Sequence, residues 1–592
     1  MMRTLILHCL SLSGICAPLA AAPFAASIQA DAHVVFSIRD TSELFESWQE
    51  HPVADVFADE SLQAFFKPLF ADEDRGGPSF TEVMEAEFGL TWEQLVELMP
   101  GQVAMMLYNL PDLVLQGVER PDLAMIAEFS GSPERLNELM RIQFERNARA
   151  QKAINPLVEH EMIEATFMGE TLYFDETFDG QATYIEDGYA LVDGIFILAT
   201  PEERLRSMVE AVKLGPSAAL ADRPAYQRVR EESGRGDVAL YFNLESLLPP
   251  LNRALQDVAT GGLALFGVSG QSLNAALALD ALEAFGVGFD MVDEGILSYS
   301  SIVYREKAGL MRLLAHAGGE LPDAAYVPEK VLSSSVTLFD PSAMLANLES
   351  ILGTASPTVL PLIDIQLRTI QARTGVDFRA ALLENFAQEV VTLSVLADDL
   401  RGASARLHPD QLFVLTIRDA EALSGALEAL KDLIPGARAQ IETIDFGGET
   451  IHRIKGLTDP SMPDAPASDF SFVITRRKLL INVGRVGLLQ QVLSAMQTQK
   501  SGFWQLPETE ALFEAIERPG AIARSYHDLG AVIAPLLHSM AQASGLAGEA
   551  RALDASQMPE DLYLPWHVVS ESNEAPDGLF TRSFILRKES AE

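Results

Sequence analysis

The chain has 592 residues, and its 43 basic and 84 acidic residues give a formal net charge of −41. Nucleic-acid phosphate and anionic lipid head groups repel such a surface, so the charge argues against both as partners. Both cysteines, Cys9 and Cys16, lie near the start of the chain, which excludes disulfides, thiol catalysis and thiolate metal sites from the remainder.

The chain opens MMRTLILHCLSLSGICAPLAAAPFAA, with one Arg, a short apolar run and then small residues. This pattern predicts a secretory signal peptide within residues 1–30, with cleavage between about Ala21 and Ala30 and a mature chain that starts near Asp31. Acylation of Cys16 is the less favoured alternative, because Ile15 stands where a small residue is needed. We therefore expect a periplasmic or secreted protein whose mature chain has no transmembrane span.

A unit of apolar strand, capping residue and amphipathic helix recurs along the chain. The expected N-caps, which accept hydrogen bonds from the first helical amides, are Asp40, Ser132, Thr200, Asp340 and Asp419. Proline follows three of them directly, at the first helical position, where its missing N–H costs nothing. Glutamates three residues after two of the caps, Glu43 and Glu203, complete predicted capping boxes.

Two short stretches, FMGETLY from Phe167 and FGGETIH from Phe446, share the letters G-E-T. Each predicts a strand, a two-residue turn and a second strand, because glycine there can adopt the positive φ of a tight hairpin. The glutamates Glu170 and Glu449 could be paired catalytic acids. The preferred interpretation is that each follows a hairpin turn and belongs to the scaffold.

The two stretches belong to a longer internal similarity. Glu170 and Glu449 differ by 449 − 170 = 279 positions, and the flanking segments keep nearly this offset and the same order. We interpret residues 31–322 and 323–592 as two diverged copies of one module. Each copy is predicted to be α+β, with an antiparallel or mixed sheet, hairpins, and N-capped helices that cover one face of the sheet.

Other candidate sites have structural explanations. His527 and Asp528 resemble a catalytic dyad, but Asp528 aligns with Asn243 as a helix cap. The tripeptide RGD at residues 235–237 suggests adhesion, but the surrounding sequence predicts that it forms the turn into a strand. The remaining histidines are scattered, without metal-ligand spacing.

Three acidic stretches, which begin at residues 71, 175 and 396, could bind Ca²⁺ but lack the spacing of a calcium loop. The uncharged run at residues 258–279 is too rich in glycine for a membrane helix and predicts a loop and an apolar helix; a lipid- or partner-facing surface is the alternative. We assign no catalytic, cofactor-binding or metal-binding residue, and we expect no cofactor.

Three segments resemble a group of exported bacterial proteins known as domain of unknown function 3352. They are ADAHVVFSIRDTSELFESW from Ala30, LALDALEAFGVGFDMVDEGILSYSSIVYRE from Leu277, and PEKVLSSSVTLFDPSAML from Pro328 with RTGVDFRAALL further on. The resemblance implies an envelope or secreted protein with repeated α+β modules, and it implies no site residues.

Three functions remain open at this point. The first is a non-enzymatic envelope protein that acts by binding or structural interaction, with an unknown envelope protein or apolar ligand as partner. The second is a carrier of lipids or other apolar ligands, suggested by the apolar run and by the methionines of AMMLYN from Ala104. The third is a hydrolase or lyase that uses carboxylates, which leave no sequence motif.

Overall fold

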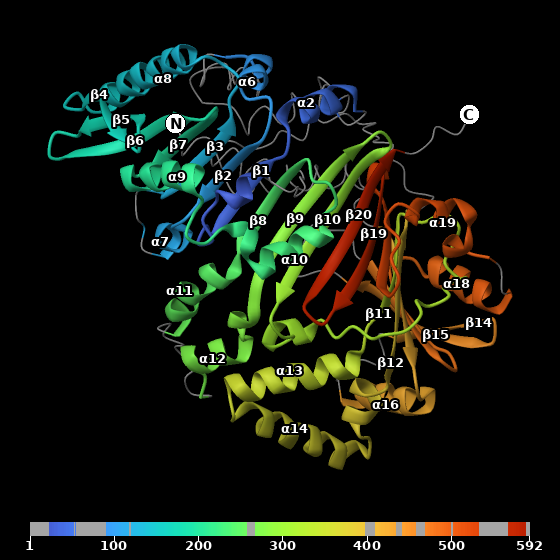
Figure 1. Ribbon diagram of the computed structural model, residues 1–592. Coiled ribbons are helices and arrows are strands. Elements are labelled where there is room, and N and C mark those ends of the chain that lie inside the picture. The colour runs from blue at the N-terminus through green and yellow to red at the C-terminus, as the bar shows by residue number, and fades with distance from the viewer. Residues whose placement is uncertain are drawn as a thin grey trace. The chain divides into compact units, whose positions relative to one another are not determined.

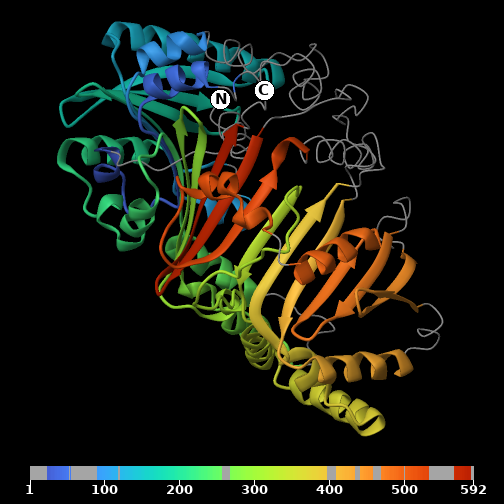
Figure 2. The ribbon, with the colours of Figure 1, turned by 90° about the vertical axis from the view of Figure 1, so that its right-hand side faces the viewer.

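A computed structural model gives the arrangement of helices and strands (Figure 1; Figure 2 is the view turned by 90°). The structure describes residues 23–51, 54, 90–115, 117, 120–256, 267–396, 409–433, 441–457, 468–498, 501–531 and 566–587. The first 22 residues of the expected signal peptide, both cysteines, the acidic stretch from residue 71, and the acidic stretch from residue 396 apart from Leu396 itself lie outside the described residues.

The described residues form two compact units. Unit 1 contains the residues up to Ala254 together with residues 282–305, and unit 2 contains residues 267–281 and those from Glu306 onward. The sequence places the division between residues 322 and 323. The difference arises because residues 267–281 pack with the part of the chain that follows residue 305.

Unit 1 is built on an antiparallel sheet with the strand order β10-β9-β8-β1-β2-β3-β7-β6-β5-β4. Its strands are β1 (Val34–Ile38), β2 (Val103–Leu107), β3 (Leu123–Glu128), β4 (Glu159–Phe167), β5 (Glu170–Phe178), β6 (Thr183–Val192), β7 (Ile195–Thr200), β8 (Val238–Asn243), β9 (Leu282–Val292) and β10 (Gly295–Tyr304).

Unit 2 has an antiparallel sheet with the strand order β20-β19-β18-β11-β12-β13-β17-β16-β15-β14. Its strands are β11 (Ser333–Leu338), β12 (Phe386–Val395), β13 (Asp410–Ile417), β14 (Ile441–Phe446), β15 (Glu449–Leu457), β16 (Ser468–Ile474), β17 (Lys478–Val483), β18 (Ala521–Asp528), β19 (Trp566–Ala575) and β20 (Gly578–Arg587). Sheets with accompanying helices confirm the α+β class.

The helices connect the strands within each unit. In unit 1 they are η1 (Pro23–Ala26), α2 (Thr41–Glu50), α6 (Trp92–Leu98), α7 (Leu110–Leu115), α8 (Pro133–Ile154), α9 (Glu202–Leu214), η2 (Leu220–Asp222), α10 (Pro224–Glu232) and α11 (Leu244–Gln256). In unit 2 they are α12 (Gly270–Leu277), η4 (Leu279–Ala281), η5 (Gly309–Leu313), α13 (Pro341–Ala355), α14 (Val359–Thr374), η6 (Arg379–Leu383), α16 (Ala420–Leu433), α18 (Val486–Thr498), η7 (Phe503–Gln505) and α19 (Pro507–Phe513).

Four of the five expected N-caps are confirmed by their hydrogen bonds. The side chains of Asp40, Ser132, Asp340 and Asp419 each accept from the amide three residues later, at 2.8 to 3.2 Å. The prediction for Thr200 is wrong, because Thr200 is the last residue of β7 and α9 begins at Glu202. Pairing of Thr200 with β3 extends the strand through the expected cap, so the capping box with Glu203 does not form.

Helices cover both faces of the unit 1 sheet, so the prediction of one covered face is also wrong. On one face, Leu136 of α8 packs with Tyr189 and Leu198. Gly188 precedes Tyr189 in β6 and therefore faces the other side of the sheet. On that side, Leu205 of α9 lies close to Gly188. Figure 1 shows α8 and α9 on opposite sides of strands β5–β7. Side chains that alternate between faces allow apolar residues on both, which accommodates two helix layers.

Candidate functional site

The repeated G-E-T stretches form the expected hairpins. Met168 and Gly169 occupy the turn between β4 and β5 with φ of 53° and 88°, and Gly447 and Gly448 occupy the turn between β14 and β15 with 59° and 85°. Glu170 forms an ion pair with Lys213 of α9, whose Nζ also donates to the Met168 carbonyl at 3.0 Å. These contacts give Glu170 a structural role at the hairpin.

The RGD tripeptide lies in the turn that leads into β8, as predicted, and its aspartate is buried. Asp237 is 5% exposed, and its Oδ1 accepts from Nη2 of Arg39 at 2.9 Å. Its Oδ2 accepts from the Met291 amide at 2.9 Å and lies 3.6 Å from Nη2 of Arg235. A receptor could not reach this carboxylate, so the geometry contradicts an adhesion role.

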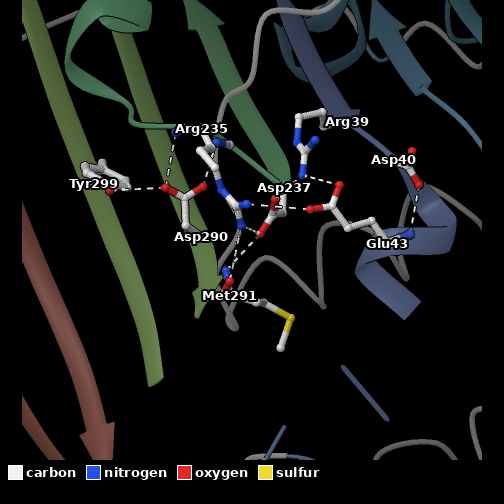
Figure 3. A network of polar contacts seen from close by, with 9 residues as sticks. Arg39, Asp40, Glu43, Arg235, Asp237, Asp290, Met291 and Tyr299 are labelled. Atoms are coloured by element: carbon white, nitrogen blue, oxygen red, sulfur yellow. Dashed lines mark hydrogen bonds and ion pairs between the residues drawn. The ribbon is translucent and has the colours of Figure 1, made fainter. Parts of the chain in front are cut away.

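A second carboxylate, Asp290 of β9, completes this network (Figure 3). Its Oδ1 accepts from the Gly236 amide at 2.6 Å, and its Oδ2 accepts from the Arg235 amide and the Tyr299 hydroxyl, each at 3.2 Å. Burial raises the pKa of Asp290, and the charge of Asp237 adds to this effect. All four carboxylate oxygens are bonded within the protein, so the network locks the turn before β8 onto β9.

The structure brings two histidines into polar clusters that the sequence interpretation did not group. In unit 1, Nδ1 of His160 lies 3.0 Å from both the Asp175 carboxylate and the Thr177 hydroxyl. The register that runs back from the Met168–Gly169 turn pairs His160 with Thr177, so counting outward from the turn could have predicted this cluster. The imidazole side chain is only 2% exposed, which makes it a core element.

In unit 2, Nδ1 of His316 lies 3.2 Å from the Glu574 carboxylate, which also pairs with Lys307. Burial lowers the pKa of His316 despite this carboxylate. His527 and Asp528 do not act together: the Asp528 carboxylate accepts from the Ala531 amide at 3.2 Å, which confirms its role as a cap. Across the described ranges, no three His, Cys, Asp or Glu side chains gather as metal ligands.

A surface pocket of about 500 Å³ lies in unit 2, between η6 and the first turns of α16. Its polar lining is already engaged, since Asp377 accepts a hydrogen bond from the Ala380 amide of η6 and Asp419 caps α16. The Asn385 amide makes four hydrogen bonds to its surroundings, and Arg418 donates to the Ser342 hydroxyl. The pocket thus combines small apolar residues, among them Val376, Ala380 and Ala422, with polar groups that are already bonded within the protein.

The unit 1 sheet has an apolar surface on four neighbouring strands. Phe36 of β1 pairs with Met105 of β2 and Leu240 of β8, and Leu240 pairs with Val287 of β9. We call this surface the Phe36 face; its half-buried members on these strands are Val34, Phe36, Ile38, Val103, Met105, Leu107, Leu240, Phe242, Phe285 and Val287.

Residues that alternate with these point to the opposite face and are almost fully buried. Val35, Ala104, Met106 and Tyr241 are 3%, 0%, 1% and 0% exposed. The half-buried positions of β1 and β2 are all apolar, and the buried positions are apolar except for Ser37. A strand with one solvated face would carry polar side chains at every second position. Val103 and Leu107 pack against the buried cluster that contains Leu136 of α8, and the other members of the Phe36 face are half-buried. Apolar surface that stays partly exposed is compatible with a binding site.

In unit 2, the strands at the matching places in the strand order carry hydroxyl groups. Ser335 of β11 pairs with Thr392 of β12 and Ser525 of β18, and Ser525 pairs with Ser570 of β19. Cross-strand hydroxyl hydrogen bonds join Ser335 to Thr392 at 2.8 Å and Ser570 to Ser583 at 2.8 Å. We call this surface the Ser335 face. In the strand order it corresponds to the Phe36 face, and its chemistry is compatible with water.

The uncharged run at residues 258–279 is described only from residue 267. There α12 begins with a capping box at Ser269, and the Ser272 hydroxyl donates to the Ala355 carbonyl at 2.7 Å. The predicted helix is confirmed, and it packs with α13 of the same unit. No helix in the described parts of the chain combines the length and apolar character needed to cross a membrane.

Comparison with known proteins gives little similarity. No family model matches the sequence, and no curated protein matches it. Crystal forms III, IV and I of a protein called TP0453 are similar in structure at 9%, 10% and 11% identity, with TM-scores of 0.23, 0.22 and 0.21. The similarity covers 48%, 49% and 48% of this chain and 80%, 82% and 79% of those chains. TM-scores this low support no inference about fold or function.

Proposed function

We propose that this is a non-enzymatic, exported binding protein that holds an apolar ligand on the Phe36 face of unit 1. The single observation that carries the proposal is the half-buried apolar row Met105–Phe36–Leu240–Val287, which crosses four strands. Among the functions open from the sequence, this observation favours the carrier of apolar ligands over a purely structural protein.

The Ser335 face supports the proposal, because hydroxyl residues occupy corresponding places in a sheet with the same strand order. Ser335, Thr392 and Ser525 stand there in place of Phe36, Met105 and Leu240. The fold therefore does not require apolar side chains at these positions. Apolar surface that folding does not require lowers the solubility of a protein. Binding of an apolar ligand would explain why this surface is present.

We also propose that the two units are diverged copies of one module. Their strand orders agree, and the helix that follows β7 (α9) and the helix that follows β17 (α18) make the same kind of contact with a hairpin turn. Nζ of Lys213 donates to the Met168 carbonyl at 3.0 Å, and Nε2 of Gln497 donates to the Gly447 carbonyl at 2.8 Å. Divergence of one sheet face after duplication would give one binding unit and one supporting unit.

Export and the resemblance to the domain of unknown function 3352 belong to the same proposal. They rest on the leader-like first 30 residues and on the segments from Ala30, Leu277 and Pro328. A hydrolase or lyase would need two free acids in reach of each other, and the two carboxylates of the network in unit 1, Asp237 and Asp290, have every oxygen bonded.

The test is a binding measurement on the full chain produced in a bacterial periplasm and purified without detergent. We expect titration with a fluorescent long-chain fatty acid to show saturable binding, and native mass spectrometry to show a bound apolar molecule. The triple variant Phe36→Ser, Met105→Thr, Leu240→Ser introduces the unit 2 residues and should weaken binding at least about tenfold, since each lost apolar contact contributes about 1 kcal/mol or more.

The matched control is Ser335→Ala with Ser525→Ala on the Ser335 face, which should leave the titration unchanged. Thermal unfolding of every variant shows whether its fold is intact. Absence of saturable binding by the unmodified protein, or equal loss of binding in the control, would contradict the proposal.

A further inference from the structure

Residues 23–32 are an integral part of unit 1. Four of their side chains are almost fully buried: Phe24 is 5% exposed, Ala25 4%, Ile28 1% and Ala32 0%. Ile28 is among the largest fully buried side chains of the described protein. This segment therefore contributes to the core, although most of it falls within the region expected to be removed as a signal peptide.

The backbone of the segment is also hydrogen-bonded to distant parts of unit 1. The Ala30 amide donates to the Ala218 carbonyl at 2.9 Å, and the Leu220 amide donates to the Ile28 carbonyl at 2.8 Å. Nδ2 of Asn243, which is itself fully buried, donates to the carbonyls of Ala30 and Ala32 at 3.0 and 3.2 Å. Loss of the segment would leave these buried groups without partners.

The N-terminal half of the segment is anchored in a similar way. The Phe24 amide donates to Oε1 of Gln102, a side chain that is 2% exposed, at 3.3 Å. Gln29 forms an isolated β-bridge with Ala219, and its side chain contacts Ser207 and Arg204 of α9. The anchored part of the chain thus extends back to Phe24.

We infer that the export leader is cleaved before Pro23, so that the mature protein keeps residues 23–32 as a structural segment. Cleavage near Ala30 would remove Phe24 and Ile28 from the core and expose the groups that they cover. The small residues that a signal peptidase requires are available at Ala20, Ala21 and Ala22. The inference rests on the proposed export and narrows the expected range of cleavage positions.

The first experiment is intact-mass spectrometry of the protein recovered from a bacterial periplasm after expression of the full chain. The expected N-terminus lies between Ala20 and Pro23. A chain that begins at an acylated Cys16 would also support the inference and would add a lipid anchor. A chain that begins after Phe24 would overturn it. Precursor of full mass that stays in the cytoplasm would overturn both the export and the cleavage.

The second experiment tests the structural role without export. A chain that begins at Pro23 and one that begins at Asp31 are produced in the cytoplasm without a leader. We expect the Pro23 form to unfold cooperatively and the Asp31 form to lose solubility or to unfold at least about 4 °C lower, as after the loss of a large buried side chain. Equal stability of the two forms would overturn the inference.

Point variants keep the test informative if the shorter chain fails to fold. Ile28→Ala opens a cavity in the core and should lower the unfolding temperature by several degrees, whereas Ala26→Ser, at an exposed position of the same segment, should change it little. An Ile28→Ala variant as stable as the Ala26→Ser control would show that the segment does not contribute to folding.

Discussion

The Asp410 carboxylate and the Arg485 side chain form an ion pair that connects the start of β13 to the start of α18. Oδ2 of Asp410 accepts from Nε and Nη2 of Arg485 at 2.9 and 2.8 Å, and its Oδ1 accepts from the Arg485 amide at 2.7 Å. Unit 1 has a similar ion pair. There Asp122, which directly precedes β3, accepts hydrogen bonds from Nε and Nη2 of Arg204 in α9, each at 2.7 Å.

We predict that Asp410→Ala lowers the free energy of unfolding by about 1–3 kcal/mol, because Asp410 is 4% exposed and its loss removes the hydrogen bonds that it accepts from the Arg485 amide and guanidinium. Urea unfolding measures this change. Glu442→Ala is the control: Glu442 and Lys455 form an ion pair in which each side chain is 52% exposed, so its loss should cost less than about 1 kcal/mol. If both variants lowered the free energy of unfolding by similar amounts, the result would contradict the prediction that burial makes the Asp410 ion pair more stabilising.

Two neighbouring methionines of β2 test the difference between the sheet faces. Met106 is 1% exposed, and Met106→Thr should lower the free energy of unfolding by about 2–4 kcal/mol, because it opens a cavity and buries a hydroxyl. Met105 lies on the Phe36 face, and Met105→Thr should cost about 1 kcal/mol or less while it weakens ligand binding. Equal destabilisation by both substitutions would assign the Phe36 face to the core.

The network around Asp290 predicts a pH dependence of stability. Because the folded-state pKa is raised by burial, the proton on Asp290 stabilises the fold below the unfolded pKa of about 3.9, and this stabilisation is lost as pH rises through the folded pKa. The variant Asp290→Asn lacks this titration. Its stability relative to the unmodified protein should therefore improve from about pH 3 to about pH 7, measured by urea unfolding.

An Asp290→Asn variant whose relative stability falls over the same pH range would contradict the assigned direction of the pKa shift. Such a result would mean that the bonds from the Gly236 and Arg235 amides, which lower the pKa, outweigh burial.

The same glycine substitution should have opposite effects at two places in unit 2. Gly448 has a φ of 85° in the hairpin turn, so Gly448→Ala should lower the free energy of unfolding by about 1 kcal/mol through backbone strain. Gly425 lies within α16 with open space around its Cα, so Gly425→Ala should raise it by about 0.5–1 kcal/mol. Thermal unfolding separates the two outcomes, and equal signs would contradict the turn geometry.

Local features of this protein were predictable because the contacts that define them span only a few residues. An N-cap such as Asp340 bonds an amide three residues later, and the Met168–Gly169 turn needs only its own backbone angles. Thr200 failed as a cap because its pairing with Leu123, far away in sequence, extended the strand. The aspartate of the RGD tripeptide is engaged by Arg39, from another strand, so its burial was not visible in the sequence.

The sequence by itself determined the α+β class, the hairpins and four helix starts, because hydrophobic periodicity and turn chemistry act locally. Only the tertiary structure decided which side chains meet. Alternation along β1 assigns Val35 and Phe36 to opposite faces, but which face becomes buried depends on the helices that pack on it. The Asp237–Asp290 network and the anchoring of Ile28 likewise depend on strands and loops that only long-range packing brings together.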